Sequence, residues 1–159
     1  MGELYAFFAY RLGSRADAED LTQETLERAL RAWARYDPAR ASPRTWLLAI
    51  ARNLLIDHYR ASANRHTLSL VDEPDIEAAH VEPEFGLDPD LAAALRRLPE
   101  REREIIALRF GADLTGPEIA ALTGLSLANV QQILSRSLRR LRAELEGPAV
   151  PPPEDSRGK

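Results

Sequence analysis

Amide and guanidinium side chains gather near the C-terminal end of the chain, and together they have the chemistry needed to bind DNA. Gln131 and Gln132 are consecutive, and a glutamine amide can pair bidentately with adenine in the major groove. Between residues 119 and 143 there are four basic residues and no acidic one, the four being Arg136, Arg139, Arg140 and Arg142. This positive segment would attract nucleic-acid phosphates, although cations are also favourable at the end of any solvated helix.

The segment that carries these residues is expected to fold as a helix-turn-helix. Gly111 is expected to end one helix in the left-handed conformation, and Pro117 suits the first turn of the next. Gly124 allows a tight turn, and Ser126 is the expected N-cap of the last helix. Apolar residues then recur at helical spacing, at Leu127, Val130, Leu134, Leu138, Leu141 and Leu145. The pattern fits a unit that inserts a helix into the major groove, and it also fits an ordinary three-helix core.

Acidic residues begin a long helix that is expected from about Ala16 to Arg35. Its first turns contain the acidic and amide side chains of Asp17, Glu19, Asp20, Gln23 and Glu24. Carboxylates are favourable at the positive N-terminal end of a helix dipole, so this role alone would explain the acids. A protein-docking surface is the alternative interpretation.

Aromatic residues flank a loop that follows this helix. Tyr36, Trp46 and Tyr59 surround a stretch that contains Arg40 and Arg44. Aromatic rings beside arginines can bind single-stranded DNA, because bases stack on the rings while the cations contact phosphates. The same rings would more commonly belong to a hydrophobic core, and the residues alone favour that interpretation.

Composition excludes several classes of protein. The chain has 159 residues, 45% of them hydrophobic, which is enough for packed cores, and it has no cysteine for disulfides or thiolate sites. His58, His66 and His80 do not have the spacing of a metal site, no phosphate-binding glycine loop or nucleophile motif is present, and no cofactor is predicted. No apolar run is long enough to span a membrane, so a cytoplasmic, non-enzymatic protein is expected.

Charge and periodicity together predict an all-α protein of two small helical domains. The net charge is −4, but the acids concentrate in residues 62–98, which hold eight acids against three arginines. We expect one domain at residues 1–61, a flexible acidic linker at 62–90, a second domain at 91–146 and a disordered proline-rich tail at 147–159. Further helices are expected at about Leu4 to Leu12 and Arg44 to Ala61.

Several stretches resemble bacterial sigma-70 family factors of the extracytoplasmic-function (ECF) group. DAEDLTQETLERA at residues 17–29 and TWLLAIARNLLID at 45–57 resemble domain 2 of that group. LPERERE at residues 98–104 and PEIA at 117–120 resemble its domain 4. The resemblance covers nearly the whole chain except the tail. It implies a transcription initiation factor that binds core RNA polymerase and directs it to promoter DNA.

The resemblance also implies roles for particular residues. The helix from Asp17 would dock on the clamp helices of the largest polymerase subunit, with further contacts to the second-largest subunit. This docking surface would consist of Asp17, Asp20, Gln23 and Glu24. The −10 element would be bound, with a flipped base, by Tyr36, Arg40, Arg44, Trp46, Ile50 and Asn53. The −35 element would be bound by Asn129, Gln131, Gln132, Arg136, Arg139 and Arg140. Factors of this group are often bound by an anti-sigma protein, which is a further expected partner.

Three departures from the family pattern bear on these expectations. The first helix is shorter than in the usual family pattern. Pro43 replaces a buried phenylalanine, and the loop before Trp46 is slightly longer, which affects the expected −10 specificity. Gln131 and Ile133 stand where basic residues are common, so phosphate attraction should be weaker and base contacts more important.

Two other classes of protein remain open from the residues alone. A stand-alone helix-turn-helix regulator, whose first domain dimerises or senses a ligand, would account for residues 105–142. A helical interaction protein that never contacts DNA is the third possibility. Neither accounts for the acidic helix, the stretch from Trp46 to Asp57 and the acidic linker together.

Overall fold

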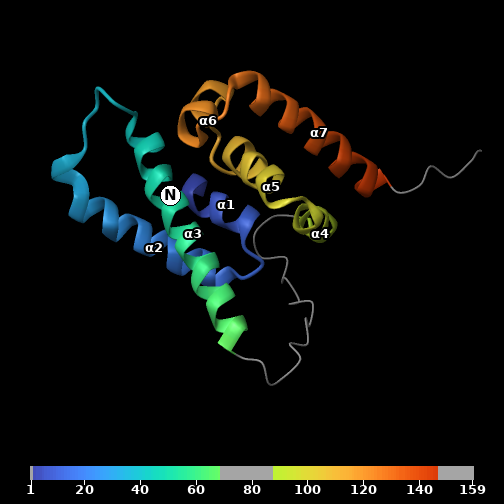
Figure 1. The fold of residues 1–159 in the computed structure, drawn as a ribbon, viewed down its shortest axis with the longest axis horizontal. Coiled ribbons are helices and arrows are strands. Elements are labelled where there is room, and N and C mark those ends of the chain that lie inside the picture. Colours follow the sequence, from blue (N-terminus) through green and yellow to red (C-terminus); the bar gives the residue numbers. More distant parts are fainter. Residues whose placement is uncertain (1, 69–87, 147–159) are drawn as a thin grey trace, which may run out of the picture.

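The computed structural model describes residues 2–68 and 88–146, and every regular element in these ranges is helical. Most of the expected linker, residues 69–87, and the expected tail, residues 147–159, lie outside the described residues. The elements are α1 (Gly2–Arg11), α2 (Arg15–Ala32), the 3₁₀ helix η1 (Trp33–Arg35), α3 (Pro43–Leu68), α4 (Pro89–Arg97), α5 (Glu100–Ile106), the π-helix η2 (Ala107–Gly111), α6 (Gly116–Thr123) and α7 (Leu127–Glu146) (Figure 1). The all-α fold class is confirmed.

Local hydrogen bonds explain where the helices of the N-terminal unit, α1 to α3, begin. Ser14 caps α2, because its hydroxyl accepts a hydrogen bond from the backbone N–H of Asp17 at 3.2 Å. Ser42 accepts a similar bond from Thr45 at 3.2 Å, and Pro43 then occupies the first position of α3. This helix continues to Leu68, past the expected end near Ala61, so the first residues of the expected linker are helical.

The C-terminal unit, α4 to α7, contains the expected helix-turn-helix. Thr115 caps α6 in a capping box with Glu118, and Gly124 ends the helix in the left-handed conformation with φ 74°. Ser126 caps α7 through the N–H of Asn129 at 3.2 Å. A helix does end at Gly111, the last residue of η2, but the predicted left-handed conformation was wrong: the left-handed residue before α6 is Asp113, with φ 52°.

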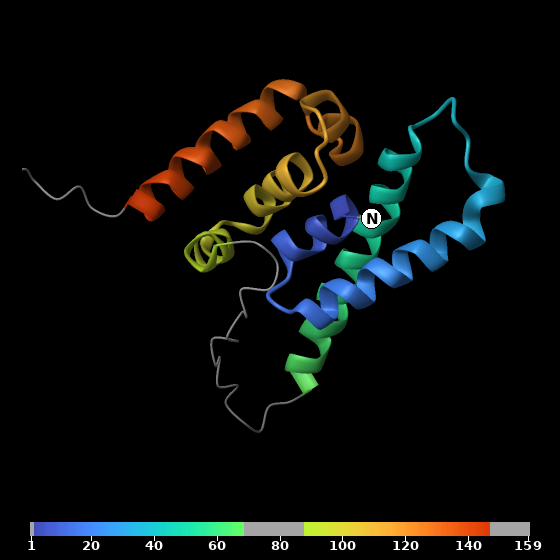
Figure 2. The ribbon, with the colours of Figure 1, turned by 180° about the vertical axis from the view of Figure 1, so that it is seen from behind.

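One hydrophobic core extends through both units, and α1 lies at its centre. Phe7 and Phe8 are consecutive, so their side chains diverge around the helix, yet both are fully buried. Their cluster includes Leu21 and Leu48 on one side and Leu108 on the other. The ribbon accordingly shows α1 between the α2–α3 pair and α5 from both directions (Figures 1 and 2).

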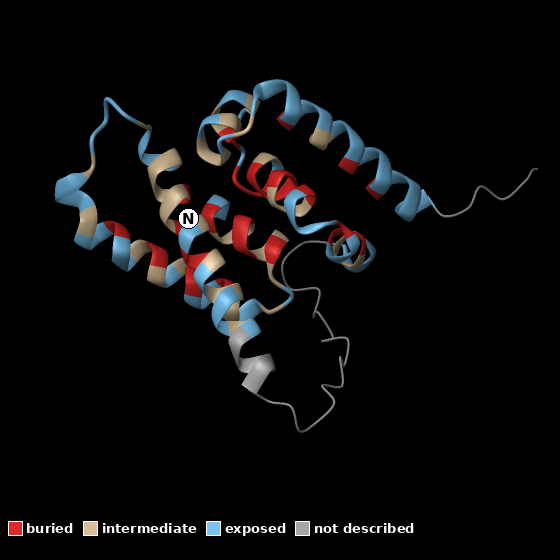
Figure 3. Cartoon of the chain, in the orientation of Figure 1, coloured by how far each residue is buried: buried red, intermediate tan, exposed pale blue. Residues whose placement is uncertain are grey.

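A smaller cluster joins the helices of the C-terminal unit. Leu95 of α4, Ile106 of α5 and Leu141 of α7 pack together, with Ala94 and Leu98 completing the cluster. The outer side of α7 is largely exposed, whereas buried residues concentrate on α1, α5 and η2 (Figure 3). None of the described helices combines the length and the apolar character that a membrane span requires.

Candidate nucleic-acid interface

Three aromatic rings cluster at the junction of η1, the following loop and α3. The ring of Tyr36 stacks on Trp33 with centroids 5.1 Å apart, and it lies 5.1 Å from the ring of Trp46 at a tilt of 48°. Trp33 is 58% exposed, so the cluster is not a sealed core. The hydroxyl of Tyr36 donates a hydrogen bond to the carbonyl of Ala41 at 3.0 Å, which fixes the loop relative to the rings.

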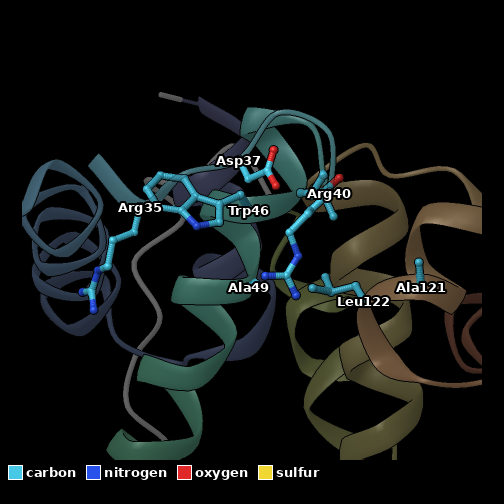
Figure 4. A pocket seen from close by; sticks show the side chains of 9 residues that line it. Arg35, Asp37, Arg40, Trp46, Ala49, Ala121 and Leu122 are labelled. Atoms are coloured by element: carbon cyan, nitrogen blue, oxygen red, sulfur yellow. The ribbon is translucent and has the colours of Figure 1, made fainter. Parts of the chain in front are cut away.

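A cavity of about 430 Å³ opens beside this aromatic cluster. Its walls come from η1, the loop, α3 and α6, and consist of Arg35, Asp37, Arg40, Ala41, Thr45, Trp46, Ala49, Ala121 and Leu122. Figure 4 shows Arg40 extending from the loop toward Leu122, whereas Arg35 points away on the other side of Trp46. The side chain of Arg40 forms no hydrogen bond or ion pair with any described residue. The guanidinium of Arg40 and the half-buried indole of Trp46 therefore line the same cavity.

The expected aromatic set is only partly brought together. Tyr59 is separate from the rings: its hydroxyl donates to the carbonyl of Arg11 at 3.0 Å, and the Arg11 guanidinium lies over its ring. These contacts agree with the interpretation of Tyr59 as a residue of the hydrophobic core and not of a DNA-binding surface. Trp33 of η1, which was not among the expected aromatic residues, completes the cluster instead. Trp33 stands three residues before Tyr36, and this spacing was the sequence feature that could have predicted the stacking of the two rings.

The other expected −10 residues differ in how accessible they are. Ile50 is half-buried on α3, while Asn53 is exposed one turn further along the same helix. Arg44 is exposed but already has partners: its guanidinium pairs with the carboxylate of Glu3 and donates to the carbonyl of Asp113 at 3.3 Å. The contact with Asp113 joins the N-terminal unit to the C-terminal unit.

The expected polymerase-docking residues lie on the first half of α2. Asp20 and Gln23 are exposed, and Asp17 and Glu24 are half-buried. Glu24 pairs with Arg28 at 2.6 Å, and the amide of Gln23 donates to Glu27 at 3.2 Å. Asp20 has no side-chain partner among the described residues, so it is the carboxylate most available to another protein.

The expected −35 residues lie on α7, and all six are exposed. They are Asn129, Gln131, Gln132, Arg136, Arg139 and Arg140. Val130, which is fully buried, anchors the helix between them. Arg140 differs from the others because it pairs with Glu102 of α5 at 3.2 Å.

The apolar stripe of α7 is less uniform than its spacing indicated. Val130 and Leu141 are buried and Leu134 is half-buried, but Leu127, Leu138 and Leu145 are 40%, 44% and 47% exposed. The C-terminal unit is too small to cover the full length of a helix this long.

Two ionisable groups near these elements have shifted pKa values. Hydrogen bonds from the side chain and backbone of Thr115 lower the pKa of the Glu118 carboxyl, since they stabilise its charged form. Burial raises the pKa of the Tyr10 phenol. Among the described residues there is no cluster of carboxylate and imidazole groups that could bind a metal ion.

Comparisons with known proteins match both units in the order expected from their motifs. Residues 1–65 match the model of sigma-70 region 2, and residues 94–143 match that of sigma-70 region 4. The chain is 36% identical over 141 residues to the ECF RNA polymerase sigma factor RpoE of Cereibacter sphaeroides, covering 87% of this chain and 78% of the relative. It is 32% identical over 143 residues to the ECF sigma factor BldN of Streptomyces coelicolor, covering 87% of this chain but only 54% of that longer protein.

A solved structure shows the same fold. The sigma factor RpoE of Bartonella quintana, crystallised with the anti-sigma factor NepR, superposes with a TM-score of 0.73 at 26% identity, over 90% of this chain and 89% of that one. The family matches, the relatives and this superposition agree on the all-helical fold and on the order of the two units. The chain therefore belongs to the sigma-70 family of RNA polymerase sigma factors, in its extracytoplasmic-function group, whose members are transcription initiation factors.

Proposed function

We propose that three surfaces of this chain carry out transcription initiation: the aromatic loop binds the −10 element, the start of α7 binds the −35 element, and α2 binds core RNA polymerase. The observation that supports this most directly is the pairing of an accessible three-ring cluster with the cavity that Arg40 enters. A core would bury these rings, whereas an unstacked base needs them exposed.

At the −10 element, a base extruded from the duplex would enter beside Trp46 and Tyr36. Extrusion costs a few kcal/mol, which stacking on the rings and hydrogen bonds to the base edge must offset. The free guanidinium of Arg40 is available for the neighbouring phosphate, and the exposed amide of Asn53 is available for a base edge on the same side of α3. The chain would thereby help to melt the promoter.

At the −35 element, α7 would enter the major groove with its N-terminal turns. Gln131 and Gln132 would contact base edges, while Arg136 and Arg139 would contact phosphates at the end of the exposed face. The resulting sequence preference depends on the two amides more than on charge, because few cations lie at the start of this helix.

On the polymerase side, Asp20 provides an exposed, unpaired carboxylate on a surface where Glu24 and Gln23 bind neighbouring side chains of the same helix. A basic or amide-rich helical surface on the largest subunit would complement it, and the second-largest subunit would contact the C-terminal unit. The factor itself would have no catalytic role and no cofactor, and it would act in the cytoplasm, where polymerase works.

A protein inhibitor is a further proposed partner. The RpoE structure contains the anti-sigma factor NepR, and a second similar structure, CnrH, contains the cytosolic domain of CnrY, with a TM-score of 0.63 at 27% identity. We infer that this chain is also bound by an anti-sigma protein.

Run-off transcription with core polymerase and a library of promoter fragments tests the main proposal. We expect the chain to form a stoichiometric complex with core polymerase and to initiate at a defined set of start sites. Specific operator binding by the free chain, without any effect on polymerase, would instead support a stand-alone regulator.

A further inference from the structure

The cavity beside the aromatic cluster has the size and the side chains of a site for a small ligand. Its volume of about 430 Å³ lies within the range of roughly 300–1,000 Å³ that is usual for small-molecule sites. We propose that the chain binds a free nucleoside 5′-monophosphate here, one whose base carries an amino group, such as adenosine monophosphate. Trp46 would contact the base, Asp37 would accept a hydrogen bond from its amino group, and Arg40 would bind the phosphate.

Arg40 provides the anion-binding part of the cavity. Its side chain extends from the loop toward Leu122 (Figure 4), and it forms no hydrogen bond or ion pair with any described residue. A guanidinium presents its N–H donors in one plane and can bind two oxygens of a phosphate at once. Two arginines of α3 are already engaged, since Arg44 and Arg52 pair with carboxylates. Arg40 is therefore available to bind a phosphate.

Trp46 provides the surface for the base. Its indole is half-buried and lines the cavity, and the ring of Tyr36 lies 5.1 Å from it at a tilt of 48°. The hydroxyl of Tyr36 donates to the carbonyl of Ala41 at 3.0 Å, so the loop and this ring are held in place before a ligand binds. A planar base can pack on the indole, and the fixed loop lowers the entropic cost of binding it.

Asp37 makes the site selective for a base with an amino group. Its side chain lines the same cavity as Arg40 and forms no ion pair with it. One carboxylate oxygen, Oδ1, accepts the backbone N–H of Ala39 at 2.9 Å, which leaves Oδ2 available. An ionised carboxylate accepts hydrogen bonds but donates none, so it favours an amino group and repels a phosphate. The two opposite charges therefore determine which way round the nucleotide binds.

The site shares Trp46 and Arg40 with the surface proposed for the −10 element. A bound nucleotide and an unpaired promoter base would therefore exclude each other, and this consequence rests on the proposed function. Nucleotide binding itself is measured on the chain alone, without polymerase or promoter. A chain that binds the nucleotide but fails in run-off transcription would contradict the proposed function, whereas the reverse result would contradict the nucleotide site.

Isothermal titration calorimetry of the full chain with adenosine monophosphate tests the site. We expect saturable binding of one nucleotide per chain. Arg40→Ala should weaken this binding about tenfold or more, because a charged hydrogen-bonding partner of the phosphate is lost. Trp46→Ala should weaken it about ten- to a hundredfold, because stacking is lost. The charge-matched control is Arg96→Ala, which removes an exposed arginine of α4 that has no partner among the described residues, and it should bind as the parent does.

Inosine monophosphate tests the orientation of the base, because it has a carbonyl oxygen where adenosine monophosphate has the amino group. The parent chain should prefer adenosine monophosphate about tenfold or more, since the hydrogen bond to the Asp37 carboxylate is lost with inosine. Asp37→Asn should remove or reverse this preference, because the asparagine amide can donate to the carbonyl oxygen. Circular dichroism identifies any variant that has lost its helices. Arg40 and Asp37 are exposed loop residues, so their variants decide if Trp46→Ala does not fold.

Three results would overturn the proposal. The first is the lack of saturable binding of adenosine monophosphate to the parent chain at millimolar concentrations. The second is equal affinity of the parent chain and Arg40→Ala for that nucleotide, which would mean that the nucleotide binds elsewhere. The third is equal affinity of the parent chain for the adenosine and inosine nucleotides.

Discussion

Arg140 of α7 and Glu102 of α5 form an ion pair, with Nη1 and Oε2 3.2 Å apart. The carboxylate is only 11% exposed, and the hydroxyl of Ser137 also donates to it at 3.4 Å. Arg140 therefore has a role in packing α7 onto α5, whereas Arg139 beside it on the helix is exposed without such a partner. Two adjacent arginines of the expected DNA surface thus have different environments.

This difference predicts that substitution of Arg140 affects stability, whereas substitution of Arg139 affects DNA binding. Arg140→Ala should lower the free energy of unfolding by about 1 kcal/mol, since it leaves Glu102 without its cation. Arg139→Ala should leave stability unchanged. It should reduce by about one the slope of the logarithm of promoter affinity against the logarithm of salt concentration, because one phosphate contact is lost. Thermal unfolding and holoenzyme binding to promoter DNA at several salt concentrations measure the two effects. Equal stability of both variants would contradict the assignment.

The three-ring cluster predicts a defect in promoter opening. Trp46→Ala should reduce open-complex formation about ten- to a hundredfold, because a stacked base contributes about 1–3 kcal/mol. Tyr36→Phe, which keeps the ring but loses the hydrogen bond to Ala41, should have a much smaller effect. Permanganate reactivity of unpaired thymines follows opening, and Tyr59→Phe is the control because Tyr59 lies outside the cluster.

Asp20 and Asn53 should separate polymerase binding from DNA melting. Asp20→Arg should weaken the affinity for core polymerase, because it reverses the charge of an exposed carboxylate that no described side chain pairs. Asn53→Ala should leave that affinity unchanged and slow open-complex formation. Pull-down and permanganate assays test both, with Asp90→Arg on α4 as a charge-matched control. If both substitutions reduce core affinity equally, this division of roles is wrong.

The capping box of α6 predicts that the free energy of unfolding falls at acidic pH, in part because Glu118 becomes protonated. In the folded chain the pKa of Glu118 lies below its ordinary value of 4.5. The ionised carboxylate therefore stabilises the folded state above pH 4.5, and this contribution is lost as the pH falls through the lowered pKa. Thr115→Ala should cost about 1 kcal/mol at neutral pH by removing the cap. Glu118→Gln should make stability less dependent on pH in this acidic range. Urea unfolding at pH 3 to 7 measures both effects, and parallel pH profiles for the parent chain and Glu118→Gln would contradict the prediction.

The sequence by itself determined the features that depend on local chemistry. Helical periodicity, the caps at Ser126 and Gly124 and the family motifs were sufficient for the all-α class, the helix-turn-helix and the sigma-factor family. These features depend on residues within a few positions of one another. Their backbone hydrogen bonds and turn conformations are therefore encoded nearby in the chain.

Only the tertiary structure decided which side chains share an environment. Gly111 ends η2 as expected, but it is not the left-handed residue, and its lack of a side chain lets η2 approach α1, more than a hundred residues away in sequence. Tyr59 was grouped with the loop aromatics, yet it binds Arg11, while Trp33 completes the ring cluster. Arg44 and Arg140 looked equivalent to their basic neighbours until their carboxylate partners were located. Burial and pairing between distant segments decide such roles, and a pattern of residue types in one segment does not contain that information.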